Sequence, residues 1–326
     1  MRCLISKSTN PYYNLAMEEY FLKNSLEEIF MLYINEPSII IGKHQNLYSE
    51  INLPYVLANN IHLARRISGG GTVYQDLYNL NFSFIHESEN LNKINFAKYT
   101  SPVLDSIRDM GVNAQFSGRN DFLIETKKVS GNAMHIFKTR VLSHGTLLFN
   151  SNLKVLSAAL RNNPEKYFDK SIKSVRSKVT NISDYLADRI PMDLFVESLF
   201  QNILTKIKDP YLNSINDQET KSIKNISTQK FQTFEWIYGY SPKYIFHNSF
   251  KFIEEPVRFC LNIEKGIIRS YQILRENKED FEYQSVFEIL VDSRHEFNSI
   301  MELLKGNEIL NSNLKFSLSD FCIHLF

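Results

Sequence analysis

Short apolar segments separated by polar residues recur along the chain and predict β-strands. Residues 29–34 (IFMLYI) and 38–41 (SIII) are almost continuously apolar, as buried strands are, and the turn sequence Asn35-Glu36-Pro37 separates them. Further strand-like segments lie at residues 80–85, 122–125, 128–130 and 141–149. We therefore expect a sheet that is built from several short strands.

Apolar residues at helical spacing interrupt these strands. Asn10-Pro11 supplies an N-cap and a proline for the first turn of a helix that runs on through Phe21. A second helical pattern covers residues 96–110 and ends at Gly111, which favours a C-terminal cap. A third apolar stripe is formed by Leu194, Leu199, Ile203 and Ile207. Because strands and helices mix without strict alternation, the pattern favours an α+β layered sheet protein over a doubly wound one.

The 326 residues of the chain are enough for about two domains. The most polar stretch, residues 213–230, is rich in Asn, Lys, Ser and Gln and predicts a long surface loop. Beyond Phe246 the pattern changes to short strands followed by helices, at residues 257–263, 267–274, 297–304 and 318–325. We therefore predict a larger domain of residues 1–245 and a smaller one of residues 246–326.

Composition and charge exclude several classes of protein. Lys and Arg (37) nearly balance Asp and Glu (36), and no basic tract is present, which argues against nucleic-acid binding. Cys3, Cys260 and Cys322 lack CxxC spacing, which argues against a disulfide framework or a zinc site and suits a reducing compartment. No run approaches the ~18 apolar residues that span a bilayer, and the first residues lack the apolar core of a signal peptide. We therefore expect a cytoplasmic protein that binds neither nucleic acid nor membrane.

The most unusual segment is residues 65–74, RRISGGGTVY. Three successive glycines let the backbone approach a ligand closely and present N–H groups to phosphate oxygens. Arg66 adds a permanent charge with bidentate geometry for phosphate or carboxylate. The segment is neither a Walker A loop nor a dinucleotide GxGxxG motif. A triple glycine alone is more often a turn, but the flanking arginines favour a ligand-binding loop.

Residues 117–133 predict a hairpin with a tight connection at Thr126-Lys127. If Glu125 pairs with Lys128, one sheet face carries Asp121, Leu123, Glu125, Lys128, Ser130 and Asn132. A carboxylate, a lysine and a hydroxyl on one face could hold a metal–nucleotide and an activated acid. The alternative is an ordinary solvent-facing strand pair with a salt bridge, and a slip of one residue would move Lys128 to the other face.

Two further segments carry candidate functional residues. His144 starts the segment HGTLLFN, where a lone histidine is more often structural than catalytic. Residues 174–181 (SVRSKVTN) are short and basic, so they form either a solvated loop or a contact to phosphate or to an acidic partner surface. No HExxH motif and no Gly-x-Ser-x-Gly elbow occurs.

Together and in this order, these segments resemble the lipoate–protein ligase A family. The match runs from about Asn14 to Asn181 and resumes at residues 234–239. Single motifs of this kind are common by chance, whereas seven in register are not. The motifs that carry the resemblance are NLAMEE, IGKHQN, RRxSGGG, GRND, KVSG, HGTLL and SVRS.

The resemblance implies the fold and the reaction. The fold would be a large mixed-sheet catalytic domain of the biotin/lipoate protein ligase type with a smaller C-terminal α+β accessory domain. Lipoate would attack the α-phosphate of ATP, with Mg²⁺ as cofactor, to give lipoyl-adenylate. A lysine of an apo lipoyl domain would then attack this mixed anhydride. The implied partners are the E2 subunits of 2-oxoacid dehydrogenases and the glycine cleavage H protein, and the enzyme would be a monomer.

The resemblance also carries roles to individual residues. Lys128 stands at the position of the family's catalytic lysine, and Asp121 stands on the magnesium side. Leu15, with its apolar neighbours, would contact the apolar lipoyl chain. The implied ATP-binding residues are Arg66, Gly71, Thr72, Val73, Tyr74, Asn120, Asp121 and Lys128. The implied lipoate-binding residues are Leu15, Arg66, Ser68, Gly70, Lys128, Gly131 and His144.

Departures from the family pattern leave alternatives open. Gln75-Asp76 replaces a usual His-Asp pair, Tyr78 replaces a common glycine, and Ser143 replaces a common second histidine.

A lipoyltransferase that uses preformed lipoyl-adenylate or a lipoylated donor protein, without ATP activation, would keep almost the same motifs. A thioester-forming transferase is disfavoured because the three cysteines lie outside every motif, and a biotin ligase because its adenylate loop has a different pattern. A catalytically silent relative that only binds lipoyl domains is disfavoured by the presence of Lys128. Lipoate and octanoate, which share a carboxylate and an apolar tail, are not distinguished.

Overall fold

The computed structural model describes the chain except for residues 89–95, 119, 162, 253–254, 275–280 and 307–316. The described residues form two compact units, and each unit draws on segments that are distant in sequence. The larger unit contains Met1–Lys43, Ile61–Ser157 and Ser174–Gln232, and the smaller unit contains His44–Asn60, Ala158–Lys173 and Thr233–Phe326. The division into domains 1–245 and 246–326 stays a prediction. In the part of the chain that the structure describes, no helix has the length and hydropathy needed to cross a membrane.

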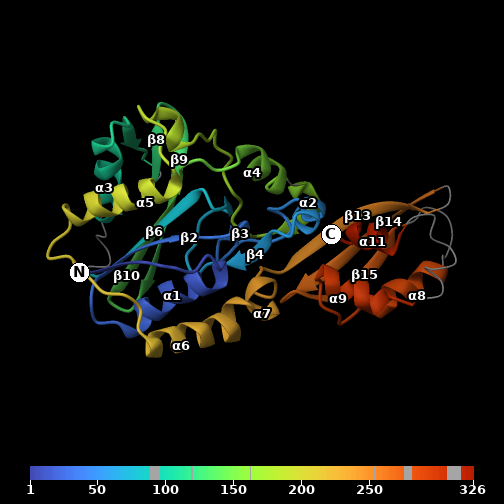
Figure 1. Ribbon diagram of the computed structural model, residues 1–326. Coiled ribbons are helices and arrows are strands. Elements are labelled where there is room, and N and C mark those ends of the chain that lie inside the picture. Colours follow the sequence, from blue (N-terminus) through green and yellow to red (C-terminus); the bar gives the residue numbers. More distant parts are fainter. Residues whose placement is uncertain (89–95, 119, 162, 253–254, 275–280, 307–316) are drawn as a thin grey trace. The chain divides into compact units, whose positions relative to one another are not determined.

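An eight-stranded mixed sheet organises the larger unit, as the α+β prediction requires (Figure 1). β1 runs parallel to β12 and β2, and the remaining neighbours pair antiparallel. The predicted strand at 29–34 is confirmed as β2. In spatial order the strands are β12 (Tyr211–Leu212), β1 (Arg2–Ile5), β2 (Ile29–Ile34), β6 (Asn79–Glu87), β10 (Arg140–Leu148), β9 (Lys127–Phe137), β8 (Asp121–Ile124) and β7 (Ala114–Phe116).

One face of this sheet forms an apolar core with two helices. Aromatic side chains of β2 and β6, such as Phe30 and Phe82, pack here against α3 (Phe96–Asp109) and α5 (Met192–Leu204). Of the predicted stripe, Leu199 and Ile203 are buried and Ile207 packs against the core, whereas Leu194 is 48% exposed. The buried stripe of α5 consists of Phe195, Val196, Leu199, Phe200 and Ile203.

The opposite face of the sheet packs against α1 (Pro11–Asn24). The helix begins as predicted, because the Asn10 side chain accepts a hydrogen bond from the N–H of Tyr13. Successive residues of a strand point to opposite faces. Ser83 therefore points toward α1 while its neighbours Phe82 and Phe84 enter the apolar core.

A three-stranded sheet carries the glycine-rich segment. Its spatial order is β4 (His62–Arg65), β3 (Ser38–Ile41) and β5 (Val73–Gln75). β3 pairs parallel with β4 and antiparallel with β5. The glycines therefore connect two strands that both bond to β3, which anchors the loop at both ends.

The prediction of a long loop at residues 213–230 is wrong. The segment forms α6 (Asp217–Ile226) followed by a π-helical turn, Ser227–Phe231. Asn216 and Glu219 form a capping box at its start, and Ile223 and Phe231 are buried. A good cap and a narrow apolar stripe are enough for a helix on a surface, so the polar composition was misleading.

The smaller unit contains a four-stranded antiparallel sheet, in the order β11 (Tyr167–Asp169), β13 (Tyr244–Phe252), β14 (Glu255–Glu264) and β15 (Ile267–Leu274). Its core is aromatic and includes Phe246, Phe259 and Phe287. The helical segment at 297–304 is confirmed as α9. Among its described residues, the helices are α2 (Leu53–Ala58), α7 (Phe234–Ile237), α8 (Phe281–Leu290), α9 (Phe297–Leu304) and α11 (Leu318–Ile323), with a 3₁₀ turn at Pro164–Lys166.

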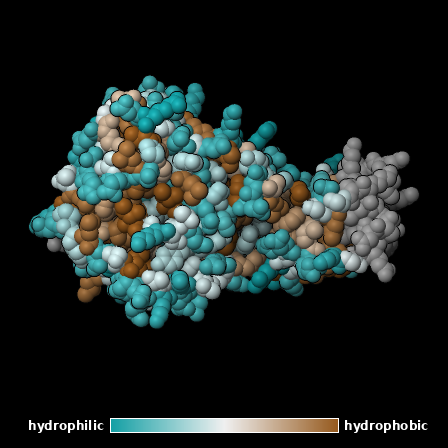
Figure 2. Space-filling view, viewed as in Figure 1, coloured by the Kyte–Doolittle hydropathy of each residue, from teal (hydrophilic) through white to brown (hydrophobic). Residues whose placement is uncertain are grey.

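Two remaining elements complete the described secondary structure. α4 (Leu153–Ala159) follows β10, and a 3₁₀ turn covers Ile182–Tyr185. Hydrophobic and hydrophilic residues are interspersed on the face shown in Figure 2. Scattered exposed apolar side chains of this kind are normal for a globular surface.

Replacement of Gly145 should destabilise the sheet. A Cβ atom at this position of β10 would lie 1.8 Å from Oδ1 of Asn132 and 2.6 Å from Cζ of Phe82. We expect Gly145→Ala to lower the free energy of unfolding by about 1–3 kcal/mol, as overpacked cores do. Urea denaturation measures this change. Gly118→Ala is the matched control, because nothing lies within 4 Å of its added Cβ; equal stability of both variants would contradict the packing argument.

Candidate functional site

The guanidinium of Arg66 is folded into the glycine-rich loop. Its Nη2 donates to the carbonyl oxygens of Gly69 (2.6 Å) and Gly71 (2.7 Å), and its Nη1 donates to that of Ile40 (3.1 Å). Burial lowers the pKa of Arg66 to about 10, with Glu18 opposing the shift, so the side chain stays charged at neutral pH. Arg66 therefore sets the shape of the loop, and Gly70 accommodates that shape with a φ of +88°.

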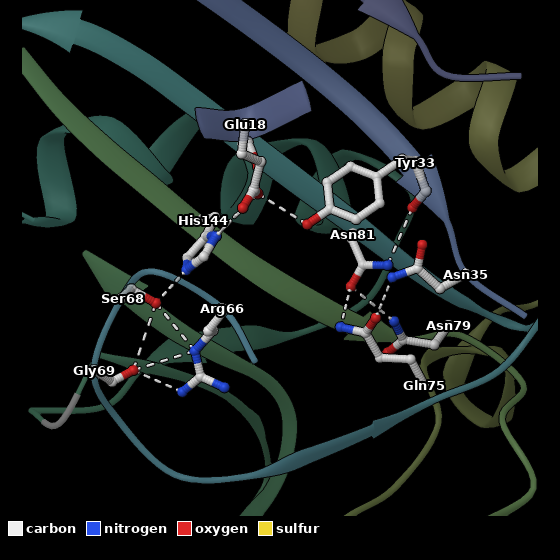
Figure 3. A network of polar contacts seen from close by, with 11 residues as sticks. Glu18, Tyr33, Asn35, Arg66, Ser68, Gly69, Gln75, Asn79, Asn81 and His144 are labelled. Carbon is white, nitrogen blue, oxygen red and sulfur yellow. Dashed lines mark hydrogen bonds and ion pairs between the residues drawn. The ribbon is translucent and has the colours of Figure 1, made fainter. Parts of the chain in front are cut away.

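A chain of buried polar contacts connects this loop to α1 (Figure 3). Nε of Arg66 donates to Oγ of Ser68 (3.0 Å), and the same Oγ lies 2.6 Å from Nε2 of His144. Nδ1 of His144 lies 2.9 Å from both carboxylate oxygens of Glu18. The structure thus brings three predicted site residues, Arg66, Ser68 and His144, into one network.

Glu18 is the buried anion of this network. It is fully buried, and it accepts hydrogen bonds from Oη of Tyr33 (2.9 Å) and from Oγ of Ser83. Burial alone would raise the pKa of Glu18, but the charge and hydrogen bond of His144 and the two hydroxyl donors outweigh burial and lower it. An ionised carboxylate only accepts hydrogen bonds, so Nδ1 of His144 carries a proton.

Glu18 is not among the predicted site residues, although it lies within the NLAMEE motif. Two signals could have identified its environment. Glu18 is a charged residue on the inner face of α1, between the buried apolar residues Leu15 and Phe21. In β6 the polar residues Asn79, Asn81 and Ser83 alternate with Leu80, Phe82 and Phe84, which indicates a polar sheet face beneath that helix.

Lys128 and Asp121 meet on the hairpin, but not in the predicted register. The turn lies at Glu125-Thr126, one residue earlier than predicted, and Ile124 pairs with Lys127. Lys128 pairs with Leu123, and by alternation along the strand its side chain lies on the same side as Asp121. A register shift follows between Phe122 and Leu123. Nζ of Lys128 lies 3.0 Å from Oδ1 of Asp121.

The same register shift removes Ser130 from the Lys128 face. Ser130 pairs with Phe122 and is 1% exposed, so its hydroxyl is directed away from Lys128. The grouping of Lys128 with Ser130 and Asn132 is therefore wrong. Gly131 takes their place: a Cβ atom on Gly131 would lie 3.0 Å from both Cε and Nζ of Lys128. The lysine side chain thus lies directly over this glycine.

Residues 174–181 connect the glycine-rich loop with the Lys128 strand. Oγ of Ser174 accepts from the N–H of Thr72 (2.9 Å). The N–H of Lys128 donates to the carbonyl of Lys178 (2.8 Å), and the N–H of Thr180 donates to the carbonyl of Lys128 (3.1 Å). These contacts fix the two ends of the segment, whereas residues 175–178 between them are exposed, and a contact to phosphate or to a partner stays a prediction.

The remaining predicted residues lie around these two groups. Leu15 is buried on α1, Tyr74 is buried in β5, and Val73 is half-buried beside it. A Cβ atom on Gly70 would lie 3.8 Å from Cβ of Ala133, the residue that pairs with His144. Asn120 has a left-handed backbone and accepts from Nδ2 of Asn132 at its carbonyl (2.7 Å). Arg119 of the GRND motif lies outside the described residues.

Further charged side chains lie around His135 of β9. Glu19 forms ion pairs with Lys23 and with Lys230 (2.6 Å). Burial, followed by the positive charge of Lys43, lowers the pKa of His135 to about 4. His135 is therefore neutral at physiological pH, and the positive charge here belongs to the lysines.

The departures from the family pattern have separate structural settings. Gln75 is buried among amides: its Nε2 donates to Oδ1 of Asn81 (2.7 Å), and its Oε1 accepts from Nδ2 of Asn35 (2.7 Å). Ser143 precedes His144 on β10 and therefore points to the opposite face, into the apolar core. Tyr78 is 50% exposed.

No group of three or more metal-ligating side chains occurs among the residues that the structure describes. Asp121 is a single carboxylate that is already paired with Lys128. Mg²⁺ in nucleotide sites is commonly held by one or two carboxylates together with substrate phosphates and water. Asp121 therefore fits a magnesium ion that arrives with a nucleotide.

Comparison with known proteins identifies consistent relatives. The model of the lipoyl protein ligase A/B catalytic domain matches residues 10–204. Lipoate–protein ligase 1 of Staphylococcus aureus is 40% identical over 305 residues, which are 92% of either chain. Lipoate-protein ligase LplJ of Bacillus subtilis is 37% identical over 301 residues, which are 91% of either chain.

Solved structures of similar fold include two with bound ATP or lipoic acid. Lipoate-protein ligase A bound with ATP has a TM-score of 0.63 and 27% identity, over 73% of this chain and 98% of that chain. A protein of Thermoplasma acidophilum with bound lipoic acid gives the same four values. A structure from the analysis of a bipartite lipoate protein ligase and its E2 lipoyl domain, from the same organism, has a TM-score of 0.62 and 27% identity. The match covers 73% of this chain and 95% of that chain.

Removal of the Glu18 charge should destabilise the protein in a pH-dependent way. Because the folded-state pKa of Glu18 is below its ordinary value of 4.5, its contribution is present above that value and is lost as the pH falls through the folded-state pKa. We expect Glu18→Gln to lower the free energy of unfolding at pH ~7 by about 1.5–3 kcal/mol, the range for hydrogen bonds to charged groups. The difference from the unsubstituted protein should shrink below pH ~4.5.

Chemical denaturation at pH ~7 and at a pH below ~4.5 measures the free energy of unfolding under both conditions. Glu28→Gln is the matched control, because Glu28 is exposed and adjoins the same sheet. A loss of stability in Glu18→Gln that stayed constant between the two pH values would show that the carboxylate is not ionised in the folded protein.

Proposed function

The chain belongs to the lipoyl protein ligase A/B family, and on that premise we propose how it joins lipoate to a lysine of a partner protein with ATP. It is an enzyme of the lipoate–protein ligase class, because relatives of that name match 92% of the chain at 40% identity. The observation that carries the proposed mechanism is the position of Lys128. Its ammonium lies over Gly131 beside Asp121, on a strand that residues 174–181 connect to the glycine-rich loop.

In the first step the lipoate carboxylate attacks the α-phosphorus of ATP, and pyrophosphate leaves. Two anions must approach each other, so a fixed positive charge between them lowers the barrier. Lys128 supplies this charge without becoming covalently attached. Backbone N–H groups of the loop and of the following residues hold the nucleotide, together with Asn120, Asp121 and residues Gly71, Thr72, Val73 and Tyr74.

Arg66 acts on the nucleotide and lipoate through the loop. Its Nη2 is occupied by the Gly69 and Gly71 carbonyls, so its main role is to hold the loop in a conformation that binds both substrates. A preorganised loop does not have to rearrange when charge develops on the phosphate.

The lipoate carboxylate binds at the part of the polar network that contains Ser68 and His144. Ser68 and His144 provide the polar contacts, and Gly70 and Gly131 leave room for the substrate next to the backbone. Glu18 keeps the imidazole of His144 in one orientation through the 2.9 Å contacts to Nδ1. The alkyl chain with its dithiolane ring lies along the apolar surface near Leu15.

Asp121 would hold a magnesium ion that accompanies ATP, and this ion would neutralise part of the phosphate charge. When the nucleotide is absent, Asp121 instead neutralises Lys128 at 3.0 Å. The carboxylate thus has an acceptable partner in both states.

In the second step the amine of an acceptor lysine attacks the lipoyl carbonyl, an amide forms, and AMP leaves. The acceptors are apo lipoyl domains of 2-oxoacid dehydrogenase E2 subunits and the glycine cleavage H protein. The enzyme works as a cytoplasmic monomer, and residues 246–326 serve as its accessory domain. The free state of all three cysteines supports a reducing compartment.

Incubation with an apo lipoyl domain, lipoate and Mg-ATP tests the function. We expect the acceptor to gain one lipoyl group in the mass spectrum, with stoichiometric release of pyrophosphate. Transfer from supplied lipoyl-adenylate without activity on lipoate and ATP would identify a lipoyltransferase instead. Inactivity with both donors would refute the proposed reaction. Octanoate in place of lipoate defines the acid preference.

Replacement of Lys128 should abolish adenylate formation while leaving the fold intact. We expect Lys128→Met to slow pyrophosphate release at least about a hundredfold, as loss of a charge-stabilising group does. Its free energy of unfolding should change by only about 0.5 kcal/mol, because the side chain is partly exposed.

Lys127→Met is the matched control, because this exposed neighbour pairs with Glu125 and takes no part in the proposed site. Normal activity of Lys128→Met, or an equal loss in Lys127→Met, would remove Lys128 from the mechanism.

A further inference from the structure

The smaller unit contains a cavity of about 410 Å³ that is built entirely from its own residues. This volume lies within the range of small-molecule sites. Four separated segments contribute: the chain around α2, the segment around the Pro164–Lys166 turn, Asn248 of β13, and the chain from the last residue of α11 onward. No residue of the proposed catalytic site lines it, so the cavity is a feature independent of the proposed function.

Positive charge lines this cavity without a matching carboxylate side chain. Arg161 and Lys166 are lining residues, and no Asp or Glu is among them. Neither side chain has an ion-pair partner in the described part of the chain. Burial lowers the pKa of Lys166, with the neighbouring Glu165 opposing the shift. A half-buried ammonium without a counter-ion is unfavourable, and a bound anion would relieve this.

The cavity also contains hydrogen-bond donors that bond to no other described residue and so stay available to a ligand. Tyr167 is 9% exposed, yet its hydroxyl has no hydrogen-bond partner within the described ranges. Two other buried tyrosines of this unit have partners. Oη of Tyr48 donates to the carbonyl of His295 (2.9 Å), and Oη of Tyr244 lies 2.6 Å from Nδ1 of His295. Nδ2 of Asn52 also lacks a partner in that part of the chain, because Asn52 uses only Oδ1, to accept from Tyr55.

Apolar side chains form another part of the wall. Ile51, Leu53 and Phe326 are buried, and the rings of Tyr48 and Phe326 lie 4.7 Å apart between centroids. Such a wall favours a hydrocarbon or aromatic group, whereas a bare inorganic anion would leave it without a partner.

We propose that this cavity binds a small organic anion, in which a carboxylate, phosphate or sulfonate group is attached to an apolar body. The anionic group lies against Lys166, Arg161 and the Tyr167 hydroxyl, where charge-assisted hydrogen bonds are strong. The apolar body packs against Tyr48, Leu53 and Phe326. The concave shape and the limited volume favour a small molecule over the surface of a protein.

Fluorescence titration with anilinonaphthalene sulfonate tests this proposal on the full chain. The probe joins one sulfonate to aromatic rings and becomes fluorescent in apolar surroundings. We expect saturable binding at one site that is about tenfold weaker in Lys166→Met, as expected for the loss of a hydrogen bond to a charged group. Tyr167→Phe should weaken binding about threefold, because it removes a neutral donor only.

Three comparisons decide the outcome. Lys305→Met should bind the probe normally, because Lys305 is an exposed lysine of the same unit. The uncharged analogue phenylnaphthylamine should bind at least about tenfold more weakly than the sulfonate. Lys128→Met should also bind the sulfonate normally, which places the probe outside the proposed catalytic site.

The proposal is overturned if Lys166→Met and Tyr167→Phe, shown to be folded by their thermal unfolding, bind as the unsubstituted protein does. It is also overturned if the uncharged analogue binds equally well, or if Lys128→Met rather than Lys166→Met loses binding. Failure of the lipoylation assay would leave this result unaffected, because the two experiments have independent readouts.

Discussion

The buried carboxylate of Glu18 is the interaction on which the candidate site depends. A buried charge is tolerated only when it is paired and hydrogen-bonded, and Glu18 meets this condition through His144, Tyr33 and Ser83. These donors come from three adjacent strands, while Glu18 comes from α1. Its charge therefore holds the helix against the polar face of the sheet and determines the orientation of His144.

The same polar network fixes the conformation of the glycine-rich loop. His144 contacts Ser68, Ser68 contacts Arg66, and the guanidinium of Arg66 gathers the loop carbonyls around itself. Glycines are needed because a side chain at Gly70 would meet the guanidinium at 3.0 Å. The loop is thus ordered by its own chain before any substrate binds, which is the condition for strong electrostatic stabilisation of a transition state.

Two polar clusters of the chain differ in how their groups are paired. Around Gln75 and Asn81 in the larger unit, side-chain amides bond to one another. In the cavity of the smaller unit, Lys166 and the Tyr167 hydroxyl have no partner among the residues that the structure describes. Paired groups hold a site in place from within, whereas unpaired groups that line a cavity stay available to a ligand.

The sequence by itself determined the elements whose signals are local. The apolar runs of β2 and β3, the Asn10 cap of α1 and the order of the motifs all lie within a few residues. The tertiary structure decided what depends on distant partners. The strand of Lys128 carries a register shift and also bonds to Lys178, and Glu18 meets His144 across 126 residues of sequence. No local pattern encodes such pairings, because their free energy arises only when the sheet brings those segments together.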